Sequence, residues 1–372
     1  DWVLSSLIFK NKSAYDFRRD YNATTFTLSS VAIGNRTLSA SQNVFAPEHA
    51  GGIFIGIGTS EVEQNGFARI TSYISPSQVN VSVQQTFGSA SLNGNECYLG
   101  EIAWSTARGW PQSATFYEGR LVFGGSKALP STVFMSVSND FLNFDVGTGQ
   151  DNDSIQLTIA TDAINSIKYV VSDRSFQIFT TDGEFVSPQS ESLPLTPGNA
   201  SFRKQTNNGI SNVAPVVLDN QTFFVRKGGH AIMSFLYDND RGSYQATTAS
   251  LLSSHLILNP IDSAVLLGSD VDANNYLFYV DTDVSGSLAI FQTLLEQNIA
   301  AWTLSTTDGL FKKITSVGSD IYFIVSRTIE GVAYDFLEKL SWDVYTDCTI
   351  LKTLTPASDT VTGLDVLAGK TV

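Results

Sequence analysis

The stretch Trp104-Ser-Thr-Ala-Arg-Gly-Trp-Pro-Gln-Ser-Ala-Thr-Phe-Tyr-Glu-Gly-Arg-Leu-Val-Phe-Gly-Gly125 is the most informative part of this 372-residue chain. Trp110-Pro111 predicts an extended entry, because a proline excludes the residue before it from the helical region. The apolar and aromatic run from Ala114 to Tyr117 predicts a strand, Glu118-Gly119 a turn, and Arg120 to Phe123 the returning strand. Two short strands joined by a tight turn are the unit of an antiparallel sheet.

The composition of the whole chain agrees with a fold built from such units. Apolar residues make up 42% of the sequence and charged residues only 16%, which is typical of a globular protein. There are 24 phenylalanines and 13 tyrosines, residue types that favour strands, and only two methionines. We therefore predict an all-β protein.

Residues 1–103 are predicted to form a small β-sandwich-like or barrel-like domain. Gly51 to Gly56 contains an apolar run bounded by glycines, which is typical of a buried strand. Gly66 to Ile74 and Gln78 to Val83 alternate apolar and polar residues around a Ser-Pro turn. The period of two predicts strands with one face in a core.

Residues 104–372 are predicted to form a β-propeller-like domain that is incomplete in this sequence. Short strands and Gly, Asn or Asp turns recur in a loose unit of about 40–50 residues, as expected for propeller blades. Five blades are visible, at 110–145, 155–185, 216–237, 264–304 and 314–342. Thr247 to Ile257, which precedes Asn259-Pro260, is the best candidate for a helix.

The charge of the chain bears on its partners. The formal net charge is −14, and residues 104–372 carry 28 acidic against 16 basic side chains. A protein that binds nucleic acid tightly needs a basic footprint, because phosphate contacts supply most of the affinity. The sequence therefore argues against tight DNA binding, and no apolar run is long enough to suggest a membrane span.

A series of short motifs between about residues 100 and 260 resembles the tail nozzle, or tail tubular protein B, family of short-tailed (podovirus) bacteriophages. The motifs are an Arg-Gly-Trp-Pro opening, a Phe-Tyr-x-Gly-Arg strand pair, an Asp-Phe-x-Asn-Phe-Asp segment and a Gly-Gly turn. Their residues are Arg108, Gly109, Trp110, Pro111, Phe116, Tyr117, Gly119, Arg120, Asp140, Phe141, Phe144, Asp145, Gly228 and Gly229.

The resemblance implies a structural virion protein of the phage tail. Members of this family form a six-fold, hexameric ring below the tail adaptor and portal proteins, around the channel through which viral DNA is ejected. They have no catalytic activity and need no cofactor. For this chain the resemblance implies DNA that passes through the ring without tight binding.

A second interpretation is a carbohydrate-binding or glycan-cleaving propeller that recognises a host surface. Ser136 to Phe141 loosely matches the aspartate box of sialidase propellers, but the glycine and tryptophan of that motif are absent. Glycoside hydrolysis also needs two carboxylates on opposite sides of the sugar, which a sequence does not reveal. We keep this as the alternative to a tail protein.

Other candidate residues have ordinary structural explanations. Asp145, Asp151 and Asp153 alternate in a glycine-rich loop and are weak calcium candidates, although the glutamate of an EF-hand is missing. The histidines His49, His230 and His255 have no metal-ligand spacing. We predict no catalytic residue and no metal ion.

The aromatic residues of the motif region are predicted to pack between sheets, because each aromatic side chain buries a large apolar area. This set comprises Trp104, Trp110, Phe116, Tyr117, Phe141 and Phe144. Cys97 and Cys348 are too few for a disulfide framework and are most simply two buried free thiols, with a single bridge as the alternative.

Overall fold

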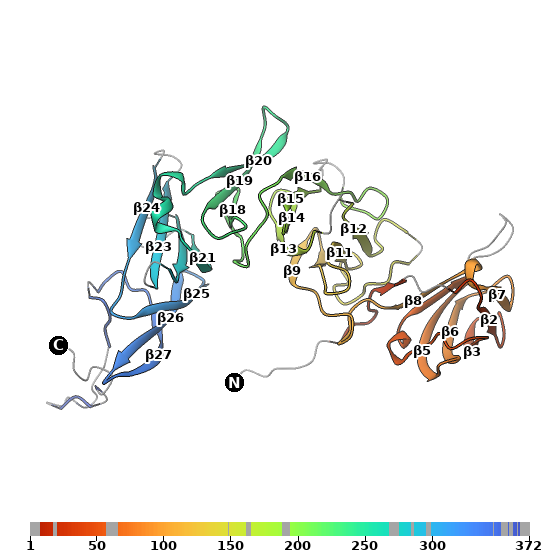
Figure 1. Cartoon of the computed structure of the whole chain (residues 1–372). Helices are drawn as coiled ribbons and strands as arrows, with labels where there is room; N and C mark the ends of the chain where they lie inside the picture. The colour runs from red at the N-terminus through yellow and green to blue at the C-terminus, as the bar shows by residue number, and fades with distance from the viewer. Residues whose placement is uncertain are drawn as a thin grey trace. The chain divides into compact units, whose positions relative to one another are not determined.

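A computed structural model gives the fold of the chain (Figure 1). It describes residues 8–17, 21–56, 66–147, 149–160, 165–187, 194–267, 275–283, 286–294, 299–344 and 346–350, together with 356, 360–362 and 364. The chain divides into two compact units. The first comprises Asp1–Ile178 and Ser187–Arg203, and the second comprises Phe179–Val186 and Lys204–Val372.

The first unit begins with an eight-stranded antiparallel sheet. Its strands are β1 (Ala14–Tyr15), β2 (Thr25–Leu28), β3 (Gly34–Ala40), β4 (Ile53–Gly56), β5 (Phe67–Ser75), β6 (Gln78–Gln85), β7 (Ser91–Asn93) and β8 (Cys97–Ile102). They lie in the order β1-β8-β4-β5-β6-β3-β2-β7. Two 3₁₀ turns, η1 (Pro47–His49) and η2 (Gly94–Glu96), interrupt the connections.

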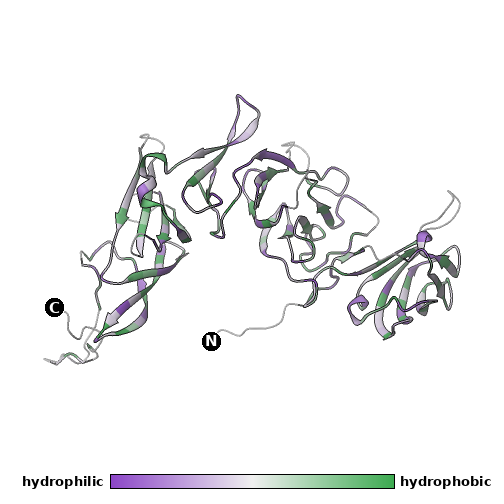
Figure 2. Ribbon diagram, viewed as in Figure 1, coloured by the Kyte–Doolittle hydropathy of each residue, from purple (hydrophilic) through white to green (hydrophobic). Residues whose placement is uncertain are grey.

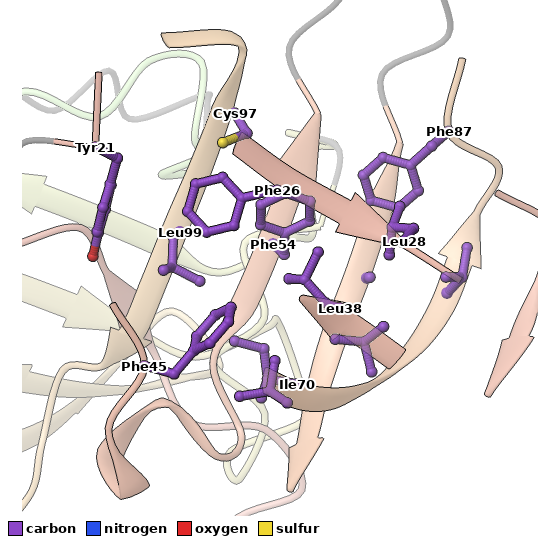
Figure 3. Close-up of a cluster of buried hydrophobic side chains, with 14 residues drawn as sticks. Tyr21, Phe26, Leu28, Leu38, Phe45, Phe54, Ile70, Phe87, Cys97 and Leu99 are labelled. Atoms are coloured by element: carbon purple, nitrogen blue, oxygen red, sulfur yellow. The ribbon is translucent and has the colours of Figure 1, made fainter. Parts of the chain in front are cut away.

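One face of this sheet encloses an apolar core. Val79, Val81 and Val83 alternate along β6 and are buried, as the period of two requires. Phe26 and Phe54 meet with ring centroids 5.3 Å apart (Figure 3). Hydrophobic positions (green) are interspersed with hydrophilic ones (purple) along these strands (Figure 2). The predicted alternation of the N-terminal region is confirmed.

The first unit also contains the first of five small antiparallel sheets. It is formed by β9 (Ser113–Tyr117), β10 (Arg120–Gly124), β11 (Thr132–Met135) and β12 (Ile155–Thr158) in sequence order. The turn between β9 and β10 has positive φ at both Glu118 (44°) and Gly119 (70°), the backbone of a two-residue type I′ hairpin. The strand–turn–strand prediction for the Trp-Pro region is therefore confirmed.

One strand lies in a different sheet from the one predicted. The sequence placed Ile155–Ile159 at the start of the second blade, but β12 pairs with β11, with Val133 opposite Leu157. The strand therefore closes the first sheet as its fourth strand. The loop between β11 and β12 is long, and strand periodicity carries no information on which neighbour a strand pairs with.

The second small sheet consists of β13 (Ile167–Ser172), β14 (Phe176–Thr180), β15 (Gly183–Val186) and β16 (Arg203–Thr206). Residues 161–164 of the predicted second blade lie outside the described residues. All five residues of β14 and all four of β15 are buried. The division between the two units falls within this sheet, in β14.

The second unit contains three further small sheets. The third sheet has β17 (Val216–Leu218), β18 (Gln221–Val225), β19 (Ile232–Asp238) and β20 (Ser243–Thr248). The fourth has β21 (Pro260–Leu266), β22 (Asn275–Asp281), β23 (Ser287–Leu294) and β24 (Ile299–Ser305). The fifth has three strands within the described residues, β25 (Leu310–Val317), β26 (Asp320–Ile329) and β27 (Val332–Lys339).

These sheets confirm the predicted fold class. The protein is nearly all β, with a series of small antiparallel sheets like the blades of a propeller. The predicted helix at 247–257 is wrong: β20 extends to Thr248, and only a short 3₁₀ segment, η3 (Leu251–Leu256), follows. Leu251 and Leu252 are 70% and 94% exposed, so this segment has no buried apolar face to stabilise an α-helix. Within the described residues no helix is long and apolar enough to cross a membrane.

Candidate functional site

One of the motif residues, Arg120 at the start of β10, is a buried arginine held by backbone carbonyl groups. The Arg120 side chain, only 2% exposed, donates from Nη1 to the carbonyl oxygens of Ser136 at 2.7 Å and Asp153 at 2.5 Å. Its Nη2 donates to the carbonyl of Asp151 at 2.8 Å. Burial lowers the pKa of Arg120 from its ordinary value, because desolvation disfavours the charged form. The guanidinium fixes the 151–153 loop against the start of β10.

This geometry gives the weak calcium candidates other partners. The carbonyls of Asp151 and Asp153 accept from Arg120, and the Asp153 carboxylate accepts from the Gln150 amide at 2.8 Å. The Asp145 carboxylate accepts from Arg69 Nη2 at 2.5 Å. Within the described residues, no group of three or more His, Cys, Asp or Glu side chains could hold a metal ion. We derive no calcium chemistry from this loop.

The Asp145–Arg69 ion pair joins the first small sheet to the eight-stranded sheet within the first unit. Arg69 lies on β5, and its side chain is 15% exposed, against 24% for Asp145. Sequence reasoning missed Arg69 as a partner. The two residues are 76 positions apart, and no local pattern links a charge on a strand to a charge in a distant loop.

Arg108 forms a second connection near the same place. Its guanidinium is hydrogen-bonded to the carboxylate of Glu101 at the end of β8 and lies over the Phe17 ring, 3.9 Å from its centroid. The following Gly109 has φ = 82°, and a Cβ there would come within 2.6 Å of the Lys127 side chain. A glycine is required at this turn for both reasons.

A cluster of aromatic rings fills the space behind the motif. Trp104 is 1% exposed, and four phenylalanine rings lie around it with centroid distances of 4.9 Å (Phe144), 5.0 Å (Phe134), 5.2 Å (Phe123) and 5.9 Å (Phe9). Most of these pairs have the edge-to-face geometry that the ring quadrupole favours. The prediction that Trp104 and Phe144 are packing residues is confirmed.

The Asp-Phe-x-Asn-Phe-Asp segment is tied to the N-terminal chain. The Lys10 ammonium donates to Asp140 Oδ1 at 2.9 Å, and this hydrogen bond lowers the pKa of Asp140. Backbone bonds from Lys10 to Leu142 and from Phe144 to Asn11, both 2.9 Å, continue the contact. We call this whole connection the joint: Arg69–Asp145, Arg108–Glu101, the Lys10–Asn11 strand contact and the Trp104 cluster.

Three aromatic residues of the motif do not pack as predicted. Trp110 is 53% exposed, Phe116 60% and Phe141 41%. Phe116 and Phe141 touch each other edge-on at 5.1 Å, but only Tyr117 on the same strand is buried, against Phe176 at 5.3 Å. Neighbouring residues of a strand point to opposite faces, so the covered face of β9 takes Tyr117 and leaves Phe116 in solvent.

A hollow of about 220 Å³ lies beside Trp110. It is lined by Phe9, Trp104, Trp110, Pro111, Gln112, Ser113, Ala114 and Phe123. Lys12 Nζ lies 5.8 Å from the centroid of the Trp110 ring. The lining is mostly apolar and contains no acidic side chain.

The remaining motif residues lie in the second unit. Gly228 and Gly229 lie in the turn between β18 and β19, with φ values of 100° and 82°. The Gly229 amide donates a hydrogen bond to the backbone carbonyl of Arg226, 2.9 Å away. The adjacent Lys227 ammonium donates to Asp182 Oδ1 at 2.5 Å and lowers the pKa of that carboxyl. The Lys227 side chain is 58% exposed and is paired with this acid.

The second unit contains a buried carboxyl group that the sequence does not mark as unusual. Glu184 on β15 is fully buried; its Oε2 accepts from the Thr206 hydroxyl and, at 3.2 Å, from the Asn208 amide. Burial raises the pKa of Glu184, and these hydrogen bonds oppose the rise. The only sequence signal was a glutamate inside an otherwise apolar strand.

The histidines and cysteines do not gather into a site. His49 is buried and accepts from the Ala46 amide at Nδ1, 3.0 Å, whereas His230 and His255 are exposed. Both cysteines are free. Cys97 is buried, and desolvation raises the pKa of its thiol to about 12, but Cys348 is exposed, contrary to the prediction of two buried thiols.

Comparisons with known proteins show weak structural likeness only. No family model and no curated protein match the chain. Similar solved structures include a Lactobacillus plantarum protein (12% identity, TM-score 0.34, 85% of this chain and 95% of that one), apo AztD from Citrobacter koseri (10%, 0.30, 82% and 89%) and an auxiliary nutrient binding protein from Bacteroides ovatus (8%, 0.24, 80% and 94%). Likeness at this level carries no functional argument.

Proposed function

We propose that this chain is a structural component of a phage tail nozzle, part of a six-fold ring around the DNA-ejection channel. Its partners are further copies of itself and the tail adaptor and portal proteins, and it performs no catalytic step. The proposal rests on the motif resemblance. The observation that supports it most is the use of the motif residues in the joint.

The joint gives the motif residues mechanical roles. Arg108, Asp140 and Asp145 are each paired with a charged partner in the first unit. Phe144 packs against Trp104. Charge-assisted hydrogen bonds and close aromatic packing together hold two sheets in a fixed geometry. A ring that withstands DNA ejection needs subunits whose parts do not shear.

The charge of the chain supports passage of DNA. Several basic groups of the described residues are already neutralised by acids, among them Lys10, Arg69, Lys227 and Lys312. Each free Lys or Arg that met a phosphate would add affinity through counterion release. A net charge of −14 therefore favours a duplex that slides without being retained.

Two experiments test this function. Gold-labelled antibodies against this chain should mark the axial tip of the phage tail in electron micrographs, and label on lateral fibres would overturn the proposal. In gel retardation at a salt concentration of about 20 mM, where phosphate contacts are strongest, duplex DNA should migrate unchanged. Tight, salt-sensitive retardation would reveal a basic face and contradict the passage model.

The hollow beside Trp110 supports a second candidate, a carbohydrate-binding propeller. An exposed tryptophan at the edge of an open hollow is a surface on which a sugar ring can stack. Titration of host polysaccharide with tryptophan fluorescence as the readout separates the two functions. Saturable quenching that is lost in Trp110→Ala and kept in the control Trp342→Ala would favour the carbohydrate-binding function. Absence of quenching would favour the tail nozzle function.

A further inference from the structure

Within the part of the chain that the structure describes, the fifth small sheet ends in an unpaired edge strand. The other four small sheets each have four strands there, and the fifth has three, β25, β26 and β27. Among the described residues β27 pairs on one side only, with β26. Val332, Tyr334 and Leu337 on this strand are 52%, 49% and 76% exposed. A long edge strand with exposed apolar side chains is a surface for pairing with another strand.

The turn before β27 determines which backbone amides of β27 point towards β26 and which point away from it. Glu330 and Gly331 form a two-residue hairpin loop, both with positive φ, between Ile329 and Val332. In such a hairpin the pair flanking the loop is hydrogen-bonded, and bonded pairs then alternate along the ladder. The amides of 332, 334, 336 and 338 therefore point to β26, and those of 333, 335, 337 and 339 point outward.

One backbone hydrogen bond agrees with this alternation. The Leu340 amide, next in the even-numbered series, donates to the carbonyl of Ile321 at the end of β26, 2.9 Å away. The outward backbone groups of Ala333, Asp335, Leu337 and Lys339 thus form a row of donors and acceptors that no described strand pairs with, and the four side chains share one face. Leu337 on this face lies opposite Ile324, itself 39% exposed.

The order of side chains along this row is self-complementary. Read in one direction it is Asp335, Leu337, Lys339, and an antiparallel copy presents lysine, leucine, aspartate. With Leu337 opposite the partner's Leu337, each Asp335 faces the partner's Lys339. A shift that sets Asp335 opposite itself would place like charges together, and one that sets it opposite Leu337 would leave both charges without opposite partners.

We propose that two copies of this chain pair edge to edge through β27, antiparallel, around a two-fold axis at Leu337. The contact joins two three-stranded sheets into one of six strands. Ile324 and Leu337 of both copies form an apolar stripe across it. Asp335 already accepts from Lys312 at 2.7 Å and Lys339 donates to Asp320 at 2.8 Å, so the new pairs extend two existing ion pairs into rows of alternating charge.

This contact is separate from the proposed role in the tail. A two-fold contact uses the same patch on both copies and cannot by itself generate a six-fold ring. If the chain does not dimerise through β27, the tail nozzle proposal is unaffected. If the antibodies label lateral fibres, the proposal of pairing through β27 is unaffected.

A charge-exchange experiment tests the pairing and its register together. Asp335→Lys gives an edge with two lysines, and Lys339→Asp gives an edge with two aspartates. In sedimentation velocity over a micromolar concentration series, the unaltered chain should dimerise reversibly and each variant alone should remain monomeric. An equimolar mixture of the two variants should restore the dimer, because both facing pairs are then opposite in charge.

A proline substitution tests whether dimerisation depends on the backbone hydrogen bonds of the edge strand. Leu337→Pro removes an outward amide, which edge strands tolerate, and should abolish dimerisation while leaving the melting temperature nearly unchanged. Val317→Lys, on the opposite outer strand of the same sheet, is the matched control and should dimerise normally. Amides of 335, 337 and 339 should gain protection from hydrogen exchange as concentration rises, and those of 334 and 336 should not.

Three results would overturn the proposal. The first is an unaltered chain that stays monomeric throughout the series. The second is a dimer that survives Leu337→Pro. The third is a mixture of the two charge variants that fails to associate although both melt normally.

Discussion

The first and the last of the small sheets differ sharply in what covers them. In the first, all four side chains of β11 are buried, and Trp104 packs against Phe134 on that strand. In the last, six of the eight residues of β27 are exposed, including Tyr334 and Leu337. Both strands have similar apolar content, so the difference lies in their neighbours: segments before and after the first sheet fold over it, and nothing among the described residues folds over β27.

The largest effect is expected from removing the centre of the joint. Trp104→Ala should lower the free energy of unfolding of the first unit by about 3–5 kcal/mol, because the cavity left among four phenylalanines has no way to close. Leu337→Ala, on the exposed strand β27, should cost less than about 0.5 kcal/mol in dilute protein. Urea denaturation followed by circular dichroism gives both values.

Trp104→Phe provides the control for that comparison. The indole N–H of Trp104 has no hydrogen-bond partner among the described residues, so phenylalanine loses volume but no hydrogen bond. It should recover more than half of the stability lost in the alanine variant. Equal losses for Trp104→Ala and Leu337→Ala would mean that the two sheets are equally covered.

The second comparison concerns two arginines held by different partners. Arg120→Met should cost about 2–3 kcal/mol, since it leaves the carbonyls of Ser136, Asp151 and Asp153 without their buried donor. Arg327→Met, on the last sheet, leaves the Asp308 carbonyl and the partly exposed carboxylates of Glu338 and Asp347 without their donor, and should cost about 1 kcal/mol. A larger loss for Arg327 in the same denaturation assay would reverse the ranking.

The same two arginines should respond differently to acid. Hydrogen bonds, with Arg327 among the donors, hold the pKa of Asp347 below its ordinary value, so its contribution is present above the unfolded pKa of 3.8 and is lost as pH falls through the lower folded pKa. Carbonyls do not titrate, so the contacts of Arg120 persist. Hydrogen exchange at pH 5 and then near pH 3 should show the amide of Asp308, which donates to Asp347, opening before the amides of 151–153.

Loss of protection at 151–153 first would contradict this assignment. Asp347→Asn is the matched variant: it should remove most of the acid response of the last sheet. The first sheet should be unaffected by that change.

The smallest effect is expected at the exposed aromatic pair of the first sheet. Phe116→Ser should change the free energy of unfolding by about 0.5 kcal/mol or less, because Phe116 and Phe141 are both largely in solvent. Tyr117→Ser, one residue on, removes a buried ring and should cost several times as much. Thermal melts of the two variants settle which face of β9 is covered.

The sequence predicts where many of the strands lie, but it does not predict which residues their side chains contact. Alternation located β6, an apolar and aromatic run located β9, and Glu118-Gly119 located the turn between β9 and β10. It gave no information about which face is covered, so Trp110, Phe116 and Phe141 were wrongly placed inside. The Arg69–Asp145 pair and the buried setting of Arg120 depend on chain segments that meet only after folding, and no local pattern encodes such meetings.

The helix error has a related cause. Leu251, Leu252 and Leu256 have a spacing that fits one side of a helix, but a short helix is stable only when that side is buried. In the structure Leu251 and Leu252 are exposed, and the chain takes a 3₁₀ turn instead. A pattern of apolar residues therefore predicts which side chains share one face of a helix, but it does not predict whether another part of the protein covers that face.

A density map of the phage tail tests the central claim most directly. Averaged around the tail axis, electron cryo-microscopy of the virion should show this chain six times around the DNA channel, with the eight-stranded sheet followed by the small sheets and Arg69 against Asp145 at the joint. Absence of the fold from the tail axis, or its presence only in lateral fibres, would contradict the account.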